Sequence, residues 1–169
     1  VRAFKGVADF TEAFQNETFA AFLAAAPSAG QSASGFAAVA EGWRDRHIFA
    51  TAPSLQDLLP QAVSLPTGAT LAVLSSGRQQ WSGADSKAKP PPAVAFYHGD
   101  LEDEKAISAW VEQNRFPGIW ALDESNFYDF THASRRTAMV AMDPAKVSRS
   151  REESLRGVAA KLKGDFLFG

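Results

Sequence analysis

Short apolar runs alternate along the first part of the chain with segments in which apolar residues recur every three or four positions. The first pattern is typical of buried strands, and the second is typical of helices that pack on a sheet. The alanine content of one run, residues 18–24, leaves a helix open there as the alternative. Strands are predicted at residues 2–4, 18–24, 47–51, 70–74 and 93–97. Helices are predicted after the N-caps Asp9 and Ser54, from Ser34 onward, and over residues 104–116.

A second cycle of the same kind follows a Pro-Gly break after residue 116. Ser125 is predicted to cap a helix that carries Phe127 and Phe130, and Ser150 is predicted to begin a capping box ahead of a helix that Gly164 ends. Strands are predicted at residues 119–122, 137–142 and 165–168. The apolar face of the last helix is predicted to comprise Leu155, Val158, Ala159 and Leu162.

The order of these elements predicts an α/β fold in two domains. Residues 1–116 contain a full set of strands and helices, whereas residues 117–169 contain only a βαβαβ unit. Residues 75–92 interrupt the first domain with a polar stretch that is rich in glycine and serine and ends in three prolines. This composition predicts an exposed insertion loop rather than a linker between domains.

Four stretches, at residues 106–116, 121–123, 140–143 and 164–169, carry a resemblance to a known family. The first three are similar to the junction between the non-catalytic b and b′ domains of the protein disulfide isomerase family, and the last is similar to the third strand of b′. Within this family the chain most resembles the transmembrane thioredoxin-related isomerases. The resemblance implies a thioredoxin-like fold, with one complete domain followed by the βαβαβ part of a second.

The resemblance also implies a location and partners. We expect the endoplasmic-reticulum lumen, with a membrane anchor in the full-length protein, and a catalytic thioredoxin domain on the same chain. Unfolded or partly folded proteins would be the substrates. Because a cis-proline precedes the fourth strand in catalytic thioredoxin folds, Pro66 and Pro92 are the candidates for that position.

An aromatic cluster in the second domain is the candidate substrate-binding surface that the resemblance implies. Holding non-native chains needs an adaptable apolar surface, which such a cluster supplies. The alternative is that Phe127 and Phe130 are inward-facing residues that hold their helix to the sheet. The candidate residues are Phe116, Ile119, Trp120, Phe127, Tyr128 and Phe130.

Charge and composition narrow the function further. The net charge of -2 provides no basic field for phosphates, so we expect no nucleic-acid partner. No apolar run approaches the roughly 20 residues of a membrane span. The sequence begins at Val1 without a methionine or a signal-peptide profile, so we interpret it as a piece of a longer protein.

The absence of cysteine excludes one chemistry outright. A thiolate is the nucleophile of thiol-disulfide exchange, and a chain with no cysteine cannot supply it. We therefore predict no catalytic residue and no cofactor in this chain. The lack of cysteine does not by itself identify the compartment.

Three histidines could instead serve a hydrolase, but no GxSxG motif accompanies them. A histidine at a strand or helix end is usually structural, so we favour that interpretation. The histidines are His47, His98 and His132, and the acids that could orient them are Asp45, Asp100 and Asp129.

Acidic residues at 100–104 and an Asn-Glu-Thr triplet are two further candidate sites. Asp100, Glu102, Asp103 and Glu104 are explained by a helix that begins there, because acids interact favourably with a helix N-terminus, and we predict no metal site. Asn16 begins the triplet, which is an N-glycosylation sequon.

We therefore hypothesise a non-catalytic region that binds substrates and positions a separate catalytic domain. A structural spacer without peptide binding is one alternative, and an unrelated α/β hydrolase is a weaker one. In thioredoxin topology a βαβαβ unit has the strand order 1-3-2, which places the strand at 137–142 on an edge. Because edge strands seek partners, we also expect the second domain either to form a homodimer with another copy of the chain or to pin itself to the first domain.

Overall fold

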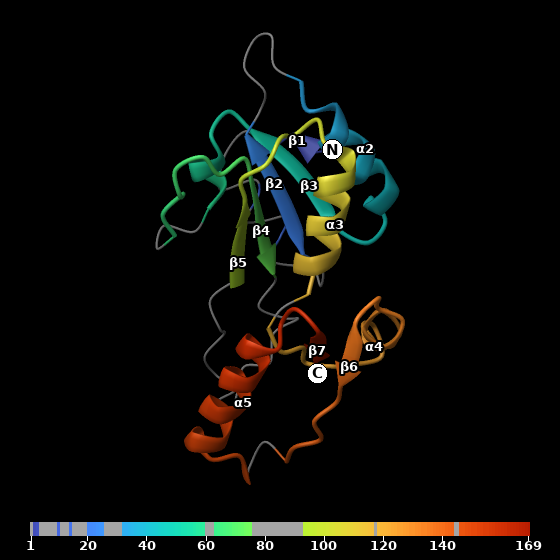
Figure 1. Cartoon of the computed structure of the whole chain (residues 1–169), viewed down its shortest axis with the longest axis vertical. Helices are drawn as coiled ribbons and strands as arrows, with labels where there is room; N and C mark the ends of the chain where they lie inside the picture. The colour runs from blue at the N-terminus through green and yellow to red at the C-terminus, as the bar shows by residue number, and fades with distance from the viewer. Residues whose placement is uncertain are drawn as a thin grey trace. The chain divides into compact units, whose positions relative to one another are not determined.

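The computed structural model describes residues 2–3, 10, 14, 20–25, 32–59, 63–75, 93–116, 118–143 and 146–169. The chain divides into two compact units, one made of Val1–Ser76 and Val94–Arg115 and the other of Gly77–Ala93 and Phe116–Gly169 (Figure 1). Each unit has core clusters of its own.

Five strands form the sheet of the first unit, in the order β1-β3-β2-β4-β5. The central strand β2 is parallel to β3 on one side and antiparallel to β4 on the other, so that Leu23 pairs with both Ala50 and Ala72. A strand that is covered on both faces has a continuous run of apolar residues. For the run predicted at residues 18–24, the strand is confirmed and the helix alternative is wrong. The strands are β1 (Arg2–Ala3), β2 (Ala21–Ala25), β3 (Ile48–Ala52), β4 (Leu71–Ser75) and β5 (Ala93–Tyr97).

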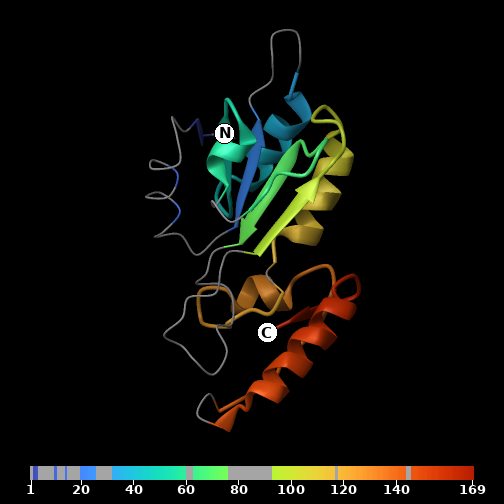
Figure 2. The ribbon, with the colours of Figure 1, turned by 90° about the vertical axis from the view of Figure 1, so that its left-hand side faces the viewer.

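Helices α2 (Ser34–Trp43) and α3 (Glu104–Asn114) lie side by side on one face of this sheet (Figure 2). Phe36 from α2 and Ile107 from α3 are buried there against the strands. The short 3-10 helix η1 (Leu55–Leu58) packs against the opposite face. Both faces of the sheet in the first unit are therefore covered by apolar side chains.

Gly35 allows α2 to approach the loop ahead of α3. A Cβ atom at this position would lie 2.5 Å from the carbonyl oxygen of Glu102, which is closer than any side chain tolerates. The backbone N–H of Phe36 donates to the carbonyl of Leu101 at 3.0 Å. Glycine at position 35 is therefore required by packing rather than by backbone conformation.

The second unit has a smaller sheet, in which β6 (Arg136–Ala138) and β7 (Phe166–Phe168) run parallel. The N–H of Trp120 donates to the carbonyl of Phe168 at 2.8 Å, so β7 lies between the segment at Trp120 and β6. This is the order 1-3-2 expected from thioredoxin topology. The helices of this unit are α4 (Phe127–Thr131) and α5 (Arg149–Lys161).

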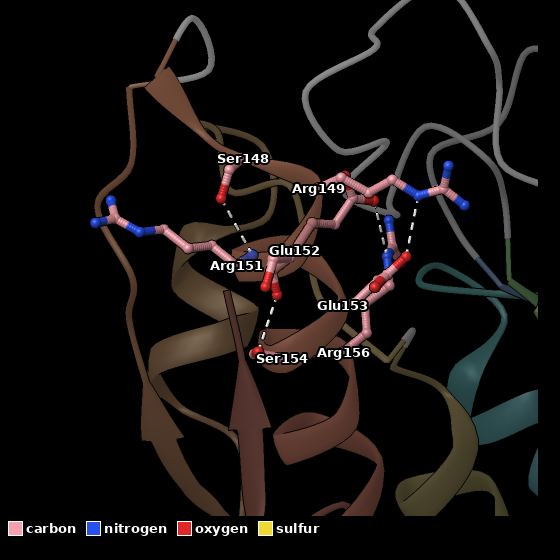
Figure 3. A network of polar contacts seen from close by, with 8 residues as sticks. Ser148, Arg149, Arg151, Glu152, Glu153, Ser154 and Arg156 are labelled. Carbon is pink, nitrogen blue, oxygen red and sulfur yellow. Dashed lines mark hydrogen bonds and ion pairs between the residues drawn. The ribbon is translucent and has the colours of Figure 1, made fainter.

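Helix α5 begins two residues earlier than the predicted capping box (Figure 3). The hydroxyl oxygen of Ser148 accepts a bond from the N–H of Arg151 at 3.4 Å, so Ser148 is the N-cap. Ser150 already lies in the first turn, where its carbonyl accepts from the hydroxyl of Ser154 at 2.9 Å. The prediction of Ser150 as the cap is therefore wrong.

The predicted stripe of α5 is only half correct. Ala159 is buried and Leu155 packs partly against the same cluster. Val158 and Leu162 are instead exposed. The stripe fails because the two-stranded sheet behind α5 is too narrow to cover all four side chains.

Three further predictions differ from the structure in extent. Ser54 stands at the N-cap of η1 but makes no capping bond through its side chain. The strand predicted at 119–122 is a single bridge at Trp120, and the one predicted at 137–142 is β6. The ladder nevertheless continues past β6, because the N–H of Val140 donates to the carbonyl of Gly169 at 2.7 Å.

Several expectations lie partly or wholly outside the described residues. One is the helix predicted to begin at Asp9, and another is the insertion loop, of which only Ser75, in β4, is described. The glycosylation candidate Asn16 and the proline candidate Pro92 also lie outside the described residues. Pro66 is described, and the described residues contain no cis peptide bond. No helix in the described ranges is long and apolar enough to cross a bilayer.

Candidate functional site

Four of the six residues predicted to bind substrate lie in the cores of the second unit. Phe116, Trp120 and Phe130 pack together with Leu167 in one cluster. Their rings are close, with the centroids of Phe116 and Trp120 4.9 Å apart. Ile119 packs in a second cluster with α5 and β7. These four side chains therefore stabilise the unit more than they offer a surface.

The other two, Phe127 and Tyr128, face solvent from α4. Their side chains are 47% and 67% exposed, whereas Phe130 on the same helix is fully buried. Phe127 is the first residue of α4 and lies outside the core cluster that contains Phe130. The core interpretation therefore holds for Phe130 and not for Phe127.

A network of hydrogen bonds holds the turn that leads into α4. The hydroxyl and N–H of Ser125 both donate to Oδ1 of Asp123, at 2.6 and 2.8 Å. The side chain of buried Asn126 accepts from the N–H of Asp123 at 3.0 Å and donates to the carbonyl of Ala121 at 2.9 Å. Asn126, not Ser125, occupies the N-cap, and the predicted cap at Ser125 is wrong because Asp123 binds its hydroxyl.

An open hollow of about 450 Å³ lies beside this turn, and we call it the α4 hollow. Its lining combines apolar rings with carboxylates. Tyr128 is held in place by a stack on His132, with ring centroids 3.9 Å apart. The lining residues are Leu122, Asp123, Glu124, Phe127 and Tyr128.

The carboxylates give the α4 hollow a negative character. The hydrogen bond from the Ser125 hydroxyl lowers the pKa of Asp123 below its ordinary value, so this group is ionised at neutral pH. Glu124 is exposed beside it. In the part of the chain that the structure describes, neither acid forms an ion pair.

A second hollow of about 420 Å³, the β6 groove, lies between the segment at Trp120 and the residues that follow β6. Met139 and Val140 are exposed in it. The groove shares Leu122 with the α4 hollow. Its lining residues are Ile119, Trp120, Ala121, Leu122, Met139, Val140, Ala141, Met142 and Gly169.

The outer edge of β6 has no strand partner among the described residues. Ala138 and Val140 bond to Gly169 on the β7 side. Because backbone groups alternate in direction along a strand, those of Thr137, Met139 and Ala141 face the opposite edge. In the first unit the corresponding edge of β2 is occupied by β4.

His47 is a core residue of the first unit. It is buried beside Phe22 and Trp43, whose ring centroids lie 5.6 and 5.5 Å from its own. Burial, with the positive charges of Arg115 and Arg46, lowers the pKa of His47 to about 3. An imidazole with that pKa is neutral at pH 7, but its burial removes it from any substrate.

The remaining candidates take structural positions. His98 and His132 are exposed, and His132 ends α4. Asp103 caps α3, because its Oδ1 accepts from the N–H of Ala106 at 3.0 Å. Asp100 accepts from a backbone N–H in the same loop. No group of acids or histidines in the described ranges has metal-site geometry.

Sequence reasoning missed the residues that complete both hollows. Leu122 ends and Glu124 closely follows the strand predicted at residues 119–122, at the carboxyl end where α/β sheets commonly bind ligands. Met139 and Val140 are adjacent apolar residues directly after β6, and in an extended chain one of any such pair must face away from the core. Both signals are present in the sequence.

The sequence matches no protein-family model and no curated protein. The structure, however, is similar to solved structures. The bb fragment of ERp72 matches with a TM-score of 0.61 and 16% identity, over 99% of this chain and 72% of that one. Human ERp44 in form II matches with a TM-score of 0.50 and 14% identity, over 99% of this chain and 41% of that one.

These neighbours are thioredoxin-like domains of the protein disulfide isomerase family. At such low identity the similarity establishes the fold, and the predicted thioredoxin-like α/β fold is confirmed. The chain spans less than half the length of the ERp44 structure. The finer resemblance to the transmembrane thioredoxin-related isomerases stays a prediction.

Proposed function

We propose that this chain is the non-catalytic, substrate-binding and scaffolding region of a protein disulfide isomerase in the endoplasmic-reticulum lumen. Residues 1–116 would be a b-type domain and residues 117–169 the first part of a b′-type domain. The catalytic thioredoxin domain would lie in another part of the full-length protein, because these 169 residues contain no cysteine. The fold shared with the bb fragment of ERp72 supports this assignment.

The observation that carries substrate binding is the exposure of Phe127 and Tyr128 at the α4 hollow. Large apolar side chains that gather at a hollow on an otherwise packed domain are typical of binding surfaces. The fixed turn at Asp123 and Asn126 holds their helix in place. The binding surface is therefore built on a rigid element.

Such a surface would act by proximity. A weakly held substrate has a high effective concentration near a catalytic domain on the same chain, because both sites belong to one molecule. Weak and unspecific apolar contacts are sufficient for this role. The chemistry itself would take place outside these residues.

The two alternatives make different demands on the structure. A spacer needs no exposed apolar hollow, and the α4 hollow therefore favours binding. A hydrolase would have to use His98 or His132 as its base, because His47 is buried with a pKa of about 3, and no GxSxG motif accompanies either. The spacer remains the alternative that an experiment must exclude.

The test compares two serine substitutions of equally exposed apolar residues. Phe127 lines the α4 hollow, whereas Val158 lies on α5 and is 46% exposed. We expect Phe127→Ser to weaken binding of a reduced, unfolded model protein about tenfold, and Val158→Ser to leave it unchanged. Isothermal titration calorimetry measures both affinities, and circular dichroism checks that both variants fold.

Two results would contradict the proposal. If the folded wild-type chain binds no unfolded protein at saturating concentration, the spacer alternative is correct. If Phe127→Ser and Val158→Ser weaken binding equally, the α4 hollow is not the binding surface.

A further inference from the structure

The α4 hollow has a charge pattern that general apolar binding does not require. Two of its five lining residues are acids, and none is basic. The acids lie beside the two most exposed parts of its apolar wall, Phe127 and Tyr128. A purely apolar ligand would leave these carboxylates partly desolvated and unmatched.

Helix α5 of the same unit shows the contrasting arrangement (Figure 3). Its acids are matched by bases one turn away, with Arg149 bonded to Glu153 and Arg156 to Glu152, each at 3.0 Å. In the described part of the chain, Asp123 and Glu124 have no such partner. The negative charge of the hollow is therefore available to a ligand.

We propose that the α4 hollow selects extended, non-native segments in which a lysine or arginine lies next to an aromatic or aliphatic residue. The inference rests on the proposed function and names its substrate class. The apolar residue would pack on Phe127 and Leu122, and the cation would lie between Glu124 and the ring of Tyr128. Both a carboxylate and an aromatic face attract a cation.

The ionised state of the Asp123 carboxylate also favours a ligand with a positive charge. Its Oδ1 accepts two bonds from Ser125, and these bonds lower its pKa. The group therefore stays charged at neutral pH and contributes to the field at the hollow without moving. Glu124 is not tied to such a network and can reach the ligand.

The experiment uses two synthetic peptides with the same apolar residues, one with lysines and one with glutamates at the charged positions. At low salt we expect the lysine peptide to bind about tenfold more tightly. At about 1 M salt the difference should disappear, because the screening length falls to roughly 3 Å. Fluorescence anisotropy of labelled peptides measures both affinities on the intact chain.

A charge-matched pair of variants locates the effect. Glu124→Gln should weaken the lysine peptide about threefold and leave the glutamate peptide no weaker. Glu153→Gln removes the same charge from α5 and should change neither affinity, because Glu153 lies outside the hollow. Both residues are exposed, so both variants should fold.

The outcomes separate the two claims. If both peptides bind equally, or if Glu124→Gln and Glu153→Gln act alike, the charge selectivity is wrong and the proposed function stands. If neither peptide binds the folded chain, the proposed function fails as well. If the glutamate peptide binds more tightly, the selectivity is overturned.

Discussion

The two units of this chain begin with the same order of strands but differ in how completely they cover their apolar surface. In the first unit β2 is paired on both sides and both faces of the sheet are packed. Among the described residues of the second unit, β6 is paired with β7 alone. All large apolar side chains exposed in the described residues belong to the second unit, namely Phe127, Tyr128, Met139, Val140, Val158 and Leu162.

The difference shows how one topology can serve two purposes. In the described residues of the first unit both faces of the sheet are covered and no large apolar side chain is exposed, so we expect this unit to provide support. A smaller sheet cannot cover every apolar side chain of its helices, so the second unit retains a surface that can bind. We therefore expect a division between support by the first unit and binding by the second.

The largest effect is expected in the core of the first unit. Phe22 is fully buried on β2 and stacks on Phe49 with centroids 5.1 Å apart. Phe22→Ala should lower the free energy of unfolding of this unit by about 3–5 kcal/mol. Phe127→Ala should cost less than about 1 kcal/mol, because half of that side chain is already in water. Urea unfolding measures both, and equal losses would contradict the division.

Acid should destabilise the first unit through His47. Its pKa is about 3 in the folded chain and 6.5 when exposed, so the unfolded state binds the proton first as the pH falls. The stabilising contribution is complete above pH 6.5 and is lost progressively between pH 6.5 and 3. At pH 5 the loss should be about 2 kcal/mol.

The matched variants for this effect are His47→Phe and His98→Gln. His47→Phe removes the buried imidazole beside Phe22 and should flatten the loss of stability between pH 7 and 5. His98 is exposed, so His98→Gln should leave the loss unchanged. If both variants behave like the wild type, His47 does not govern the acid sensitivity.

The outer edge of β6, which no strand occupies among the described residues, should allow two copies of the chain to pair. An antiparallel pairing centred on Met139 would place Thr137 opposite Ala141 of the other copy and Arg135 opposite its Asp143. Thr137→Pro removes an N–H that faces this edge and should weaken self-association about tenfold, or about 1.4 kcal/mol. Thr137→Val keeps the N–H and should preserve it.

Sedimentation equilibrium over a range of concentrations measures this association. A wild-type chain that stays monomeric at high concentration would show that the edge of β6 does not pair with a second copy. Equal dimerisation of the Thr137→Pro and Thr137→Val variants would show that the interface lies elsewhere.

The smallest effect concerns the start of α5. Ser148→Ala should cost about 0.5–1 kcal/mol, because its side chain accepts a backbone bond, although a long one at 3.4 Å. Ser150→Ala should be close to neutral, since the capping bond belongs to Ser148. Thermal unfolding of the two variants measures the loss of stability. A larger loss for Ser150→Ala than for Ser148→Ala would show that Ser150 is the cap.

Most of the fold could be predicted from the sequence, because the first unit obeys local rules. The apolar run at β2 and the helical stripe through Phe36 and Val39 form the elements that their periods predict. The errors occur where tertiary context decides. Ser150 has the sequence of a cap, but Ser148 is the N-cap of α5, and Val158 fits an apolar stripe that the narrow sheet does not cover.

The candidate site was predictable only in part, for a related reason. The aromatic residues indicate the region in which the α4 hollow lies, but the sequence does not tell which ring a five-residue helix buries. Phe130 is in the core and Phe127 is outside it. Glu124 lies in the turn before α4, close in sequence to the other residues of its hollow, whereas Met139 joins the β6 groove only through the pairing of distant segments.

The most direct test of the division is a titration of the isotopically labelled chain with a reduced, unfolded model protein, followed residue by residue by amide chemical shifts. We predict that the changes in amide chemical shift are concentrated at residues 122–132 and at the β6 groove, and that the amide shifts of β2, β3 and β4 do not change. Shifts concentrated on the first unit, with residues 122–132 unmoved while the chain stays folded, would contradict it.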